Sequence, residues 1–196
     1  DVIFVHQCPV SKKVINEAKN LKYILSCRGG VENIDMEAAK EKGVKVINCP
    51  AHNAYAVAEY TIGMILNELR NITRACMALK SGEWREKYQN SETLTEVRSQ
   101  TIGIIGFGTI GRLVVERLKG FHPTILVNDP FADEDKIREE GCEPVTKEEL
   151  LKRSDVVTIH ARINAGDPPI IGKEEFGQMK ETAYLINTAR AVAVDM

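Results

Sequence analysis

The sequence predicts an α/β protein made of two units, each a parallel sheet covered by helices. Short runs of β-branched residues alternate with segments of helical composition. This alternation occurs twice, once before residue 50 and again after residue 100, and a long helical stretch with a polar connection separates the two series. Apolar residues make up 43% of the 196 positions, which is enough to form a buried core.

The first series has the order strand, helix, strand, helix, strand. Strands are expected at 1–5, 22–27 and 44–49, and helices at 11–20 and 36–43. Ser11 is placed to cap the first helix and Gly43 to end the second. This order predicts a parallel sheet, because parallel neighbours require crossover connections.

The longest helical signal covers residues 54–79, where apolar residues recur near the helical period without an interrupting proline. The polar segment 81–100 follows, and its Trp84 is expected to anchor it by packing. We therefore predict one domain at 1–97, which includes the helix 54–79 between the domains, and a second domain at 98–196.

The second series begins at Thr101 and alternates in the same way. Strands are expected at 101–106, 124–129, 143–145, 155–161 and 183–189. Helices are expected at 109–121, 133–141, 147–153 and 173–179. A second parallel sheet follows from this order.

Composition excludes several classes of function. The net charge is −2 and the sequence has no stripe of basic residues, so no nucleic-acid partner is expected. The apolar runs are too short to span a membrane. The start has no signal-peptide pattern, so a cytoplasmic location is expected. The five cysteines are odd in number and widely spaced, which predicts reduced, mostly buried thiols and no metal site.

The stretch TIGIIGFGTIGR, residues 101–112, contains three glycines with the spacing of a dinucleotide-binding turn. Gly106 would permit a tight turn, Gly108 would let the main chain approach a pyrophosphate, and Gly111 would let the helix pack closely on the strand. The helix N-terminus then offers unpaired N–H groups to phosphate.

An acidic residue, Asp129, ends the next expected strand, where it can accept hydrogen bonds from the adenosine ribose. Its carboxylate would repel a 2′-phosphate, so NAD is favoured over NADP. The alternative is that Asp129 only forms a turn together with Pro130. Strand, glycine turn, helix and acid together predict NAD binding.

Four ordered segments of the sequence are RGGVENIDMEAAKEKGVKVINCP, NAYAVAEYTIGMILNELRN, GFGTIGR and AYLINTARAVAVD. Together they resemble the D-2-hydroxyacid dehydrogenase family, which includes D-3-phosphoglycerate dehydrogenase. The resemblance implies a flavodoxin-like substrate domain and a Rossmann NAD-binding domain, both doubly wound, with a cleft between them. It also implies reduction of a small 2-keto acid, or oxidation of a D-2-hydroxy acid, with NAD as cofactor, in a homodimer.

The resemblance assigns roles to individual residues. Arg190 matches the catalytic arginine, whose rigid fork can orient the substrate and polarise its ketone. The expected substrate contacts are Arg28, Gly29, Gly30 and Asn53. Besides the glycines and Asp129, the expected cofactor contacts are Thr109, Ile110, His160, Ala161, Thr188, Ala189 and Arg190.

The sequence departs from the family pattern at its ends. The family's proton-donating histidine and its carboxylate partner come after the arginine strand, beyond Met196, so we expect both domains to be truncated and this chain alone to turn over negligibly. No histidine within the chain is assigned as the acid. Two alternatives stay open, an NAD(H)-sensing corepressor-type regulator and a formate dehydrogenase of the same fold.

Overall fold

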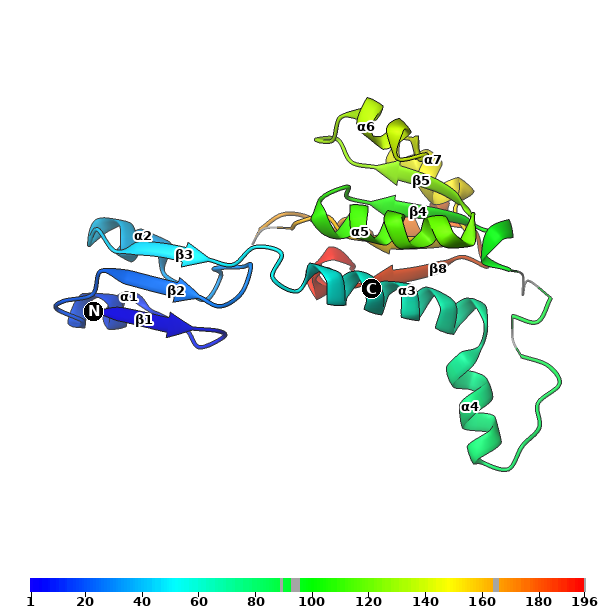
Figure 1. Cartoon of the computed structure of the whole chain (residues 1–196), viewed down its shortest axis with the longest axis horizontal. Coiled ribbons are helices and arrows are strands. Elements are labelled where there is room, and N and C mark those ends of the chain that lie inside the picture. Colours follow the sequence, from blue (N-terminus) through cyan, green and yellow to red (C-terminus); the bar gives the residue numbers. More distant parts are fainter. Residues whose placement is uncertain (89, 93–95, 164–165, 196) are drawn as a thin grey trace. The chain divides into compact units, whose positions relative to one another are not determined.

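The computed structural model describes residues 1–88, 90–92, 96–163 and 166–195. By packing, the chain divides into two compact units, Asp1–Asn53 and Ala54–Met196, both drawn in Figure 1. This division differs from the expected boundary at residue 97, because the helix that begins at Ala54 packs against a helix of the second unit. Assignment of residues 54–97 to a substrate domain therefore stays a prediction.

The first unit contains the five elements expected from the sequence. Its strands β1 (Val2–Val5), β2 (Tyr23–Ser26) and β3 (Lys45–Asn48) form a parallel sheet in the order β1-β2-β3. Its helices are α1 (Lys12–Glu17) and α2 (Met36–Glu41). Ser11 caps α1 by accepting a hydrogen bond from Val14 N, and Gly43 follows α2 with a φ of +72°.

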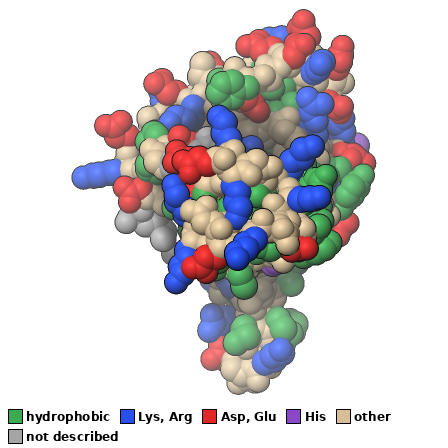
Figure 2. All heavy atoms as spheres, turned by 90° about the vertical axis from the view of Figure 1, so that its left-hand side faces the viewer, with side chains coloured by type: hydrophobic (Ala, Val, Ile, Leu, Met, Phe, Trp, Pro, Cys, Tyr) green, Lys and Arg blue, Asp and Glu red, His purple; other side chains and the backbone are tan. Residues whose placement is uncertain are grey.

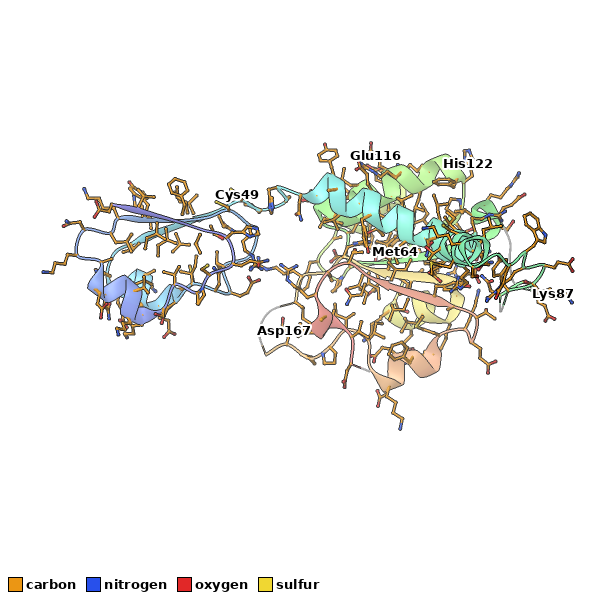
Figure 3. The ribbon with its side chains drawn as sticks, turned by 90° about the horizontal axis from the view of Figure 1, so that it is seen from below. Cys49, Met64, Lys87, Glu116, His122 and Asp167 are labelled. Carbon is orange, nitrogen blue, oxygen red and sulfur yellow. The ribbon has the colours of Figure 1, made fainter. Side chains whose placement is uncertain are left out.

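The two faces of this sheet differ in burial because side chains alternate along each strand. Val5 and Ile24 face the helices and pack with Ile15 of α1 and Ala38 of α2. Figure 3 shows both helices on the same side of the sheet. Exposed apolar side chains occupy the opposite face, namely Val2, Phe4, Tyr23 and Ile47. Within this unit, helices therefore cover one face of the sheet.

The second unit contains a five-stranded parallel sheet in the order β6-β5-β4-β7-β8. The strands are β4 (Thr101–Ile105), β5 (Thr124–Asn128), β6 (Glu143–Pro144), β7 (Val156–Ile159) and β8 (Tyr184–Asn187). Every strand expected in the second series is present. The first strand in the chain, β4, lies at the centre of this sheet, and the later strands are added on both sides of it.

Helices cover both faces of this sheet, as a doubly wound fold requires. The helices are α3 (Ala54–Leu69), α4 (Ile72–Lys80), α5 (Thr109–Leu118), α6 (Glu134–Glu139), α7 (Lys147–Arg153) and α8 (Lys173–Gln178), with short 3-10 segments η1 (Val97–Ser99), η2 (Lys119–Phe121) and η3 (Ala191–Ala193). One apolar cluster joins α3 and α5 to the sheet, and another joins α7 to it. The predicted α/β class with parallel sheets is confirmed.

The single helix expected at 54–79 is wrong in one respect, because α3 and α4 are separate helices. Asn71 lies between them with a φ of 55°, in the left-handed region that asparagine tolerates better than most residues. Its side chain is 2% exposed and accepts a hydrogen bond from Arg74 Nη1 at 3.1 Å. Asn67 Oδ1 accepts a hydrogen bond from Thr73 N, which satisfies a donor at the start of α4.

The chain after this break leaves apolar side chains exposed. In Figure 1, α4 points away from the sheet of its unit. Ile72, Met77 and Leu79 are exposed on it. Trp84 is 82% exposed, so the expectation that it anchors the connection by packing is wrong. A tryptophan in a polar segment has nothing nearby to pack on unless the chain folds back.

The expectation of mostly buried cysteines is also wrong. Cys8, Cys27, Cys49 and Cys76 are exposed free thiols, and only Cys142 is buried among the described residues. Burial raises the pKa of Cys142 to about 11. Cys27 and Cys49 directly follow strands β2 and β3, where the chain leaves the sheet, so the core does not cover them.

On the face seen in Figure 2, Lys and Arg side chains are interspersed with Asp and Glu. None of the helices in the described part of the chain has the length and apolar character that crossing a bilayer would need.

Candidate active site

The glycine turn between β4 and α5 has the conformation expected from its three glycines. Gly106 has a φ of +95°, and a Cβ there would lie 2.5 Å from Ala161 N. A Cβ at Gly111 would collide with the carbonyl oxygen of Gly106, so the absence of a side chain lets α5 pack against the turn. Both glycines are therefore required sterically, as predicted.

Gly108 has a different role from the other two. It is the N-cap residue of α5, in an extended conformation, and no side chain caps the helix. A Cβ at Gly108 would meet no atom within 4 Å, so its surroundings are open. The first turn of α5 also has no acidic residue. Its N–H groups and the positive end of its dipole are therefore available to an anion.

Asp129 lies directly on this turn. Its Oδ2 accepts a hydrogen bond from Phe107 N at 2.7 Å, and its Oδ1 accepts one from Phe131 N at 2.9 Å. The hydrogen bond from Phe131 N corresponds to the turn-forming role that the sequence left open as an alternative for Asp129. The first contact joins the acid at the end of β5 to the main chain between Gly106 and Gly108.

Arg112 also holds the turn, and the sequence analysis did not single it out. Its Nε donates a hydrogen bond to Phe107 O at 3.1 Å, and its guanidinium carbon lies 5.0 Å from the centre of the Phe107 ring. The buried Phe107 ring packs in the core of the unit. The sequence shows an arginine one turn into the expected helix, but Arg112 binds a main-chain carbonyl, and no sequence motif specifies such a partner.

His160 and Ala161 lie beside the turn, at the end of β7. His160 N donates a hydrogen bond to Ile105 O at 2.7 Å, which continues the ladder between β7 and β4 past Ile159. Its Nε2 lies 3.0 Å from Thr158 Oγ1. Burial lowers the pKa of His160 to about 4, so the ring is neutral at neutral pH.

Asn187 organises the segment that carries Arg190, and the sequence analysis missed it. Its Oδ1 accepts a hydrogen bond from Ala189 N at 3.0 Å, and its Nδ2 donates one to Arg190 O at 2.7 Å. The side chain of Arg190 is exposed, and its Nη1 donates to Ala189 O at 3.0 Å. Within the described residues Arg190 makes no ion pair.

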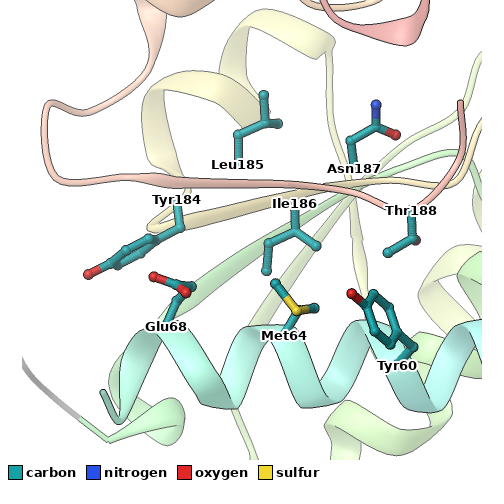
Figure 4. A pocket seen from close by; sticks show the side chains of 8 residues that line it. All are labelled: Tyr60, Met64, Glu68, Tyr184, Leu185, Ile186, Asn187 and Thr188. Carbon is teal, nitrogen blue, oxygen red and sulfur yellow. The ribbon is translucent and has the colours of Figure 1, made fainter. Parts of the chain in front are cut away.

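A groove runs between α3 and β8 and ends at Thr188. It encloses about 340 Å³, with a smaller pocket of about 280 Å³ at the Thr188 end. Figure 4 shows Tyr60, Met64 and Glu68 facing it from successive turns of α3. Tyr184 and Ile186 face it from β8, and Thr188 faces it from the position directly after the strand, because alternate residues point to the same side. Figure 3 also labels Met64.

The residues expected to contact the substrate lie in the first unit. Asn48 Nδ2 donates a hydrogen bond to Gly29 O at 2.6 Å, and Ser26 Oγ donates one to Gly30 O at 3.1 Å. These bonds fix the carbonyls of the loop. In the described structure no acceptor occupies the N–H of Gly29 or of Gly30.

Two charged side chains flank this loop. The carboxylate of Glu32 lies against Gly30 and forms an ion pair with Arg28 at 3.3 Å. Asn53 directly precedes α3, and its side chain has no hydrogen bond to any residue in the described ranges. The loop is therefore organised around a carboxylate.

The model of the D-isomer specific 2-hydroxyacid dehydrogenase NAD binding domain matches residues 62–196. The chain belongs to this family. Residues 62–196 accordingly belong to the NAD-binding domain of this family, and the glycine turn with Asp129 lies within the matched residues.

Relatives in the 2-hydroxyacid dehydrogenase family align along the whole chain. It is 39% identical to a D-3-phosphoglycerate dehydrogenase of Methanocaldococcus jannaschii, covering 100% of this chain and 37% of that protein. It is 36% identical to a hydroxypyruvate reductase of Thermotoga maritima, covering 100% of this chain and 62% of that protein. The chain thus spans between about a third and two thirds of the length of these relatives.

Solved structures of this family agree with the fold of the chain. The D-lactate dehydrogenase of Aquifex aeolicus, determined with NAD and lactic acid, superposes with a TM-score of 0.86 at 31% identity. That match covers 99% of this chain and 58% of the other. The apo D-lactate dehydrogenase of Escherichia coli superposes with a TM-score of 0.84 at 33% identity, covering 99% and 60%.

Proposed function

We propose that this protein is an NAD-dependent oxidoreductase that interconverts a small 2-keto acid and a D-2-hydroxy acid by hydride transfer. The observation that carries the proposal is the hydrogen bond from Phe107 N to Asp129 Oδ2 at 2.7 Å. It joins the turn proposed to bind phosphate to the acid proposed to bind the ribose.

The cofactor residues fit NAD along the edge of one sheet. The N–H groups of Gly108, Thr109 and Ile110 would bind the pyrophosphate at the start of α5. Asp129, at the end of β5, would accept hydrogen bonds from the adenosine ribose and would repel a 2′-phosphate. In the sheet, β7 and β8 lie on the opposite side of β4 from β5. The nicotinamide would therefore extend toward the ends of β7 and β8.

The residues at those strand ends would supply the remaining contacts. His160 and Ala161 would line the cofactor beyond the turn, and Thr188 and Ala189 would contact its nicotinamide end. Bound NADH supplies the hydride. Arg190 would orient the substrate and stabilise the negative charge that develops on the ketone oxygen.

The loop of the first unit is proposed to bind the carboxylate of the substrate. The N–H groups of Gly29 and Gly30 would donate to the substrate carboxylate, with the Arg28 guanidinium adding positive charge, and Asn53 is proposed as a further substrate contact. The Glu32 carboxylate, which already lies against Gly30, would be displaced by that of the substrate. His160 is not assigned as the proton donor, because a pKa of about 4 leaves it without a proton to give at neutral pH.

Calorimetric titration with NADH and NADPH tests the cofactor assignment. We expect NADH to bind and NADPH to bind at least about tenfold more weakly, because the Asp129 carboxylate opposes the extra phosphate. Asp129→Asn should narrow that difference. Asp133→Asn is the matched control, because Asp133 caps α6 and has no contact with the glycine turn. Absence of heat with both cofactors would refute the proposal.

Turnover is tested with a polypeptide that also carries the family's proton donor. NADH oxidation should be measured across 2-keto acids of varied size and charge. We expect Arg190→Lys to lower kcat while NADH affinity is kept, because lysine lacks the planar fork. NADH binding without turnover on any keto acid would favour the alternative of an NAD(H)-sensing regulator.

A homodimer formed through α4 and the segment that follows it is also proposed. Exposed Ile72, Met77 and Leu79 on α4, and Trp84 after it, give an apolar surface of the kind that protein interfaces use. Sedimentation analysis should show a dimer, and Trp84→Ala with Leu79→Glu should shift it to monomer. A monomeric wild-type protein would contradict the proposed dimer.

A cytoplasmic location stays a prediction.

A further inference from the structure

A pair of threonine hydroxyls connects helix α3 to the end of strand β8. Thr61 lies in α3 and is 0% exposed. Its Oγ1 lies 3.0 Å from Oγ1 of Thr188, the residue that directly follows β8. The two positions are 127 residues apart in the chain. This contact therefore exists only because the fold brings the helix and the strand together.

The direction of the hydrogen bond follows from a second contact. Thr61 Oγ1 also lies 2.9 Å from the carbonyl oxygen of Val57, which can only accept. The single hydroxyl proton of Thr61 is therefore used on Val57. The Thr188 hydroxyl must then donate to Thr61, which fixes the Thr188 rotamer and directs its proton toward α3.

The segment after β8 is consequently held from two sides. On one side, Asn187 binds Ala189 N and Arg190 O. On the other, the Thr61 hydroxyl holds the side chain of Thr188. Since Asp129 and Thr188 follow strands on opposite sides of β4, the Thr188 side corresponds to the nicotinamide half of the bound cofactor.

We propose that Thr61 is a positioning residue that fixes Thr188, and through it the segment to Arg190, for the nicotinamide half of the cofactor. The inference rests on the proposed function. It assigns to α3 a part in the site although Thr61 itself is buried and touches no ligand. The adenosine half, bound at the turn and Asp129, does not depend on this contact.

Calorimetric titration with NADH and with ADP-ribose, which lacks the nicotinamide, separates the two halves. Thr61→Val keeps the shape of the side chain and removes the hydroxyl. We expect it to weaken NADH binding roughly three- to tenfold, the effect of one lost neutral hydrogen bond, and to leave ADP-ribose binding unchanged. Thr61→Ser keeps the hydroxyl and should restore NADH affinity. Urea unfolding of each variant reports any general loss of stability separately.

A role in packing alone would make the two ligands respond equally, and equal or absent effects in Thr61→Val would overturn the inference. Thr61→Ala also removes the hydroxyl, with a smaller side chain, and tests the inference if Thr61→Val does not fold. It must show the same selective loss of NADH binding. If the unaltered protein binds neither NADH nor ADP-ribose, the proposed function itself fails, an outcome distinct from unselective variants.

Discussion

Replacement of Gly106 by alanine tests the steric reasoning about the cofactor turn. The new Cβ would lie 2.5 Å from Ala161 N, 2.7 Å from Ala161 Cα and 2.8 Å from the carbonyl carbon of His160. Non-bonded heavy atoms prefer roughly 3.5 Å or more, so the turn and the end of β7 must separate by about 1 Å. All three contacts are with main chain, which cannot rotate away as a side chain can.

Two costs add in Gly106→Ala. Alanine with a positive φ costs about 1–2 kcal/mol, and overpacking costs about 1–3 kcal/mol. We therefore expect the free energy of unfolding to fall by about 2–5 kcal/mol. NADH binding should be lost as well, because the displaced turn carries the N–H groups proposed to bind the pyrophosphate.

Gly141→Ala is the matched control. Gly141 has a φ of +73°, but a Cβ there would meet nothing within 4 Å. This variant therefore incurs only the conformational cost of about 1–2 kcal/mol and should bind NADH as the unaltered protein does. Urea unfolding measures the free energy of unfolding of both variants, and titration with NADH measures their affinity for the cofactor. Equal stability losses, or intact NADH binding by Gly106→Ala, would refute the assigned geometry.

Three further outcomes are expected. Asn187→Ala removes the hydrogen bonds to Ala189 N and Arg190 O and should lower the free energy of unfolding by about 2 kcal/mol, measured in urea. Burial lowers the pKa of His160 from 6.5 to about 4. Between pH 6.5 and about 4 the unfolded chain therefore binds a proton at this histidine that the folded protein does not bind. Stability should therefore fall as pH falls from 6.5 toward 4, by roughly 3 kcal/mol at most, and His160→Gln should flatten this dependence in urea unfolding. A thiol reagent should modify the exposed cysteines in the native protein and Cys142, whose pKa is raised to about 11, only on unfolding.

The fold could be predicted from local patterns because each pattern has a local cause. The strand around Ile102 and Ile104 is apolar on both faces, as buried parallel strands are, and its end is marked by Gly106. The break at Asn71 could not be predicted in the same way. The apolar residues on its two sides keep the helical spacing. The left-handed conformation of Asn71 and its part-buried hydrogen bond with Arg74 are features that this spacing does not specify.

The candidate site was predictable in part for the same reason. Gly106 and Gly111 are needed sterically by a known kind of turn, so their spacing carries information. Arg112, Asn187 and Thr61 act through hydrogen bonds to main chain or to residues distant in sequence, and such partners are set by the tertiary fold. Their residue types alone are common in helices and strand ends, so nothing distinguished them beforehand.

The two sides of the cofactor turn are held in different ways, and this has a consequence for how variants should behave. On the proposed adenosine side, Asp129 accepts hydrogen bonds from Phe107 N and Phe131 N, so replacing it with asparagine leaves one acceptor oxygen for these two N–H groups. Cofactor choice and turn geometry are therefore coupled at that residue. On the other side, Thr188 is held through a side-chain hydroxyl of α3. A change at Thr61 can therefore alter the nicotinamide end while the turn keeps its shape, which is why ADP-ribose and NADH are expected to respond differently.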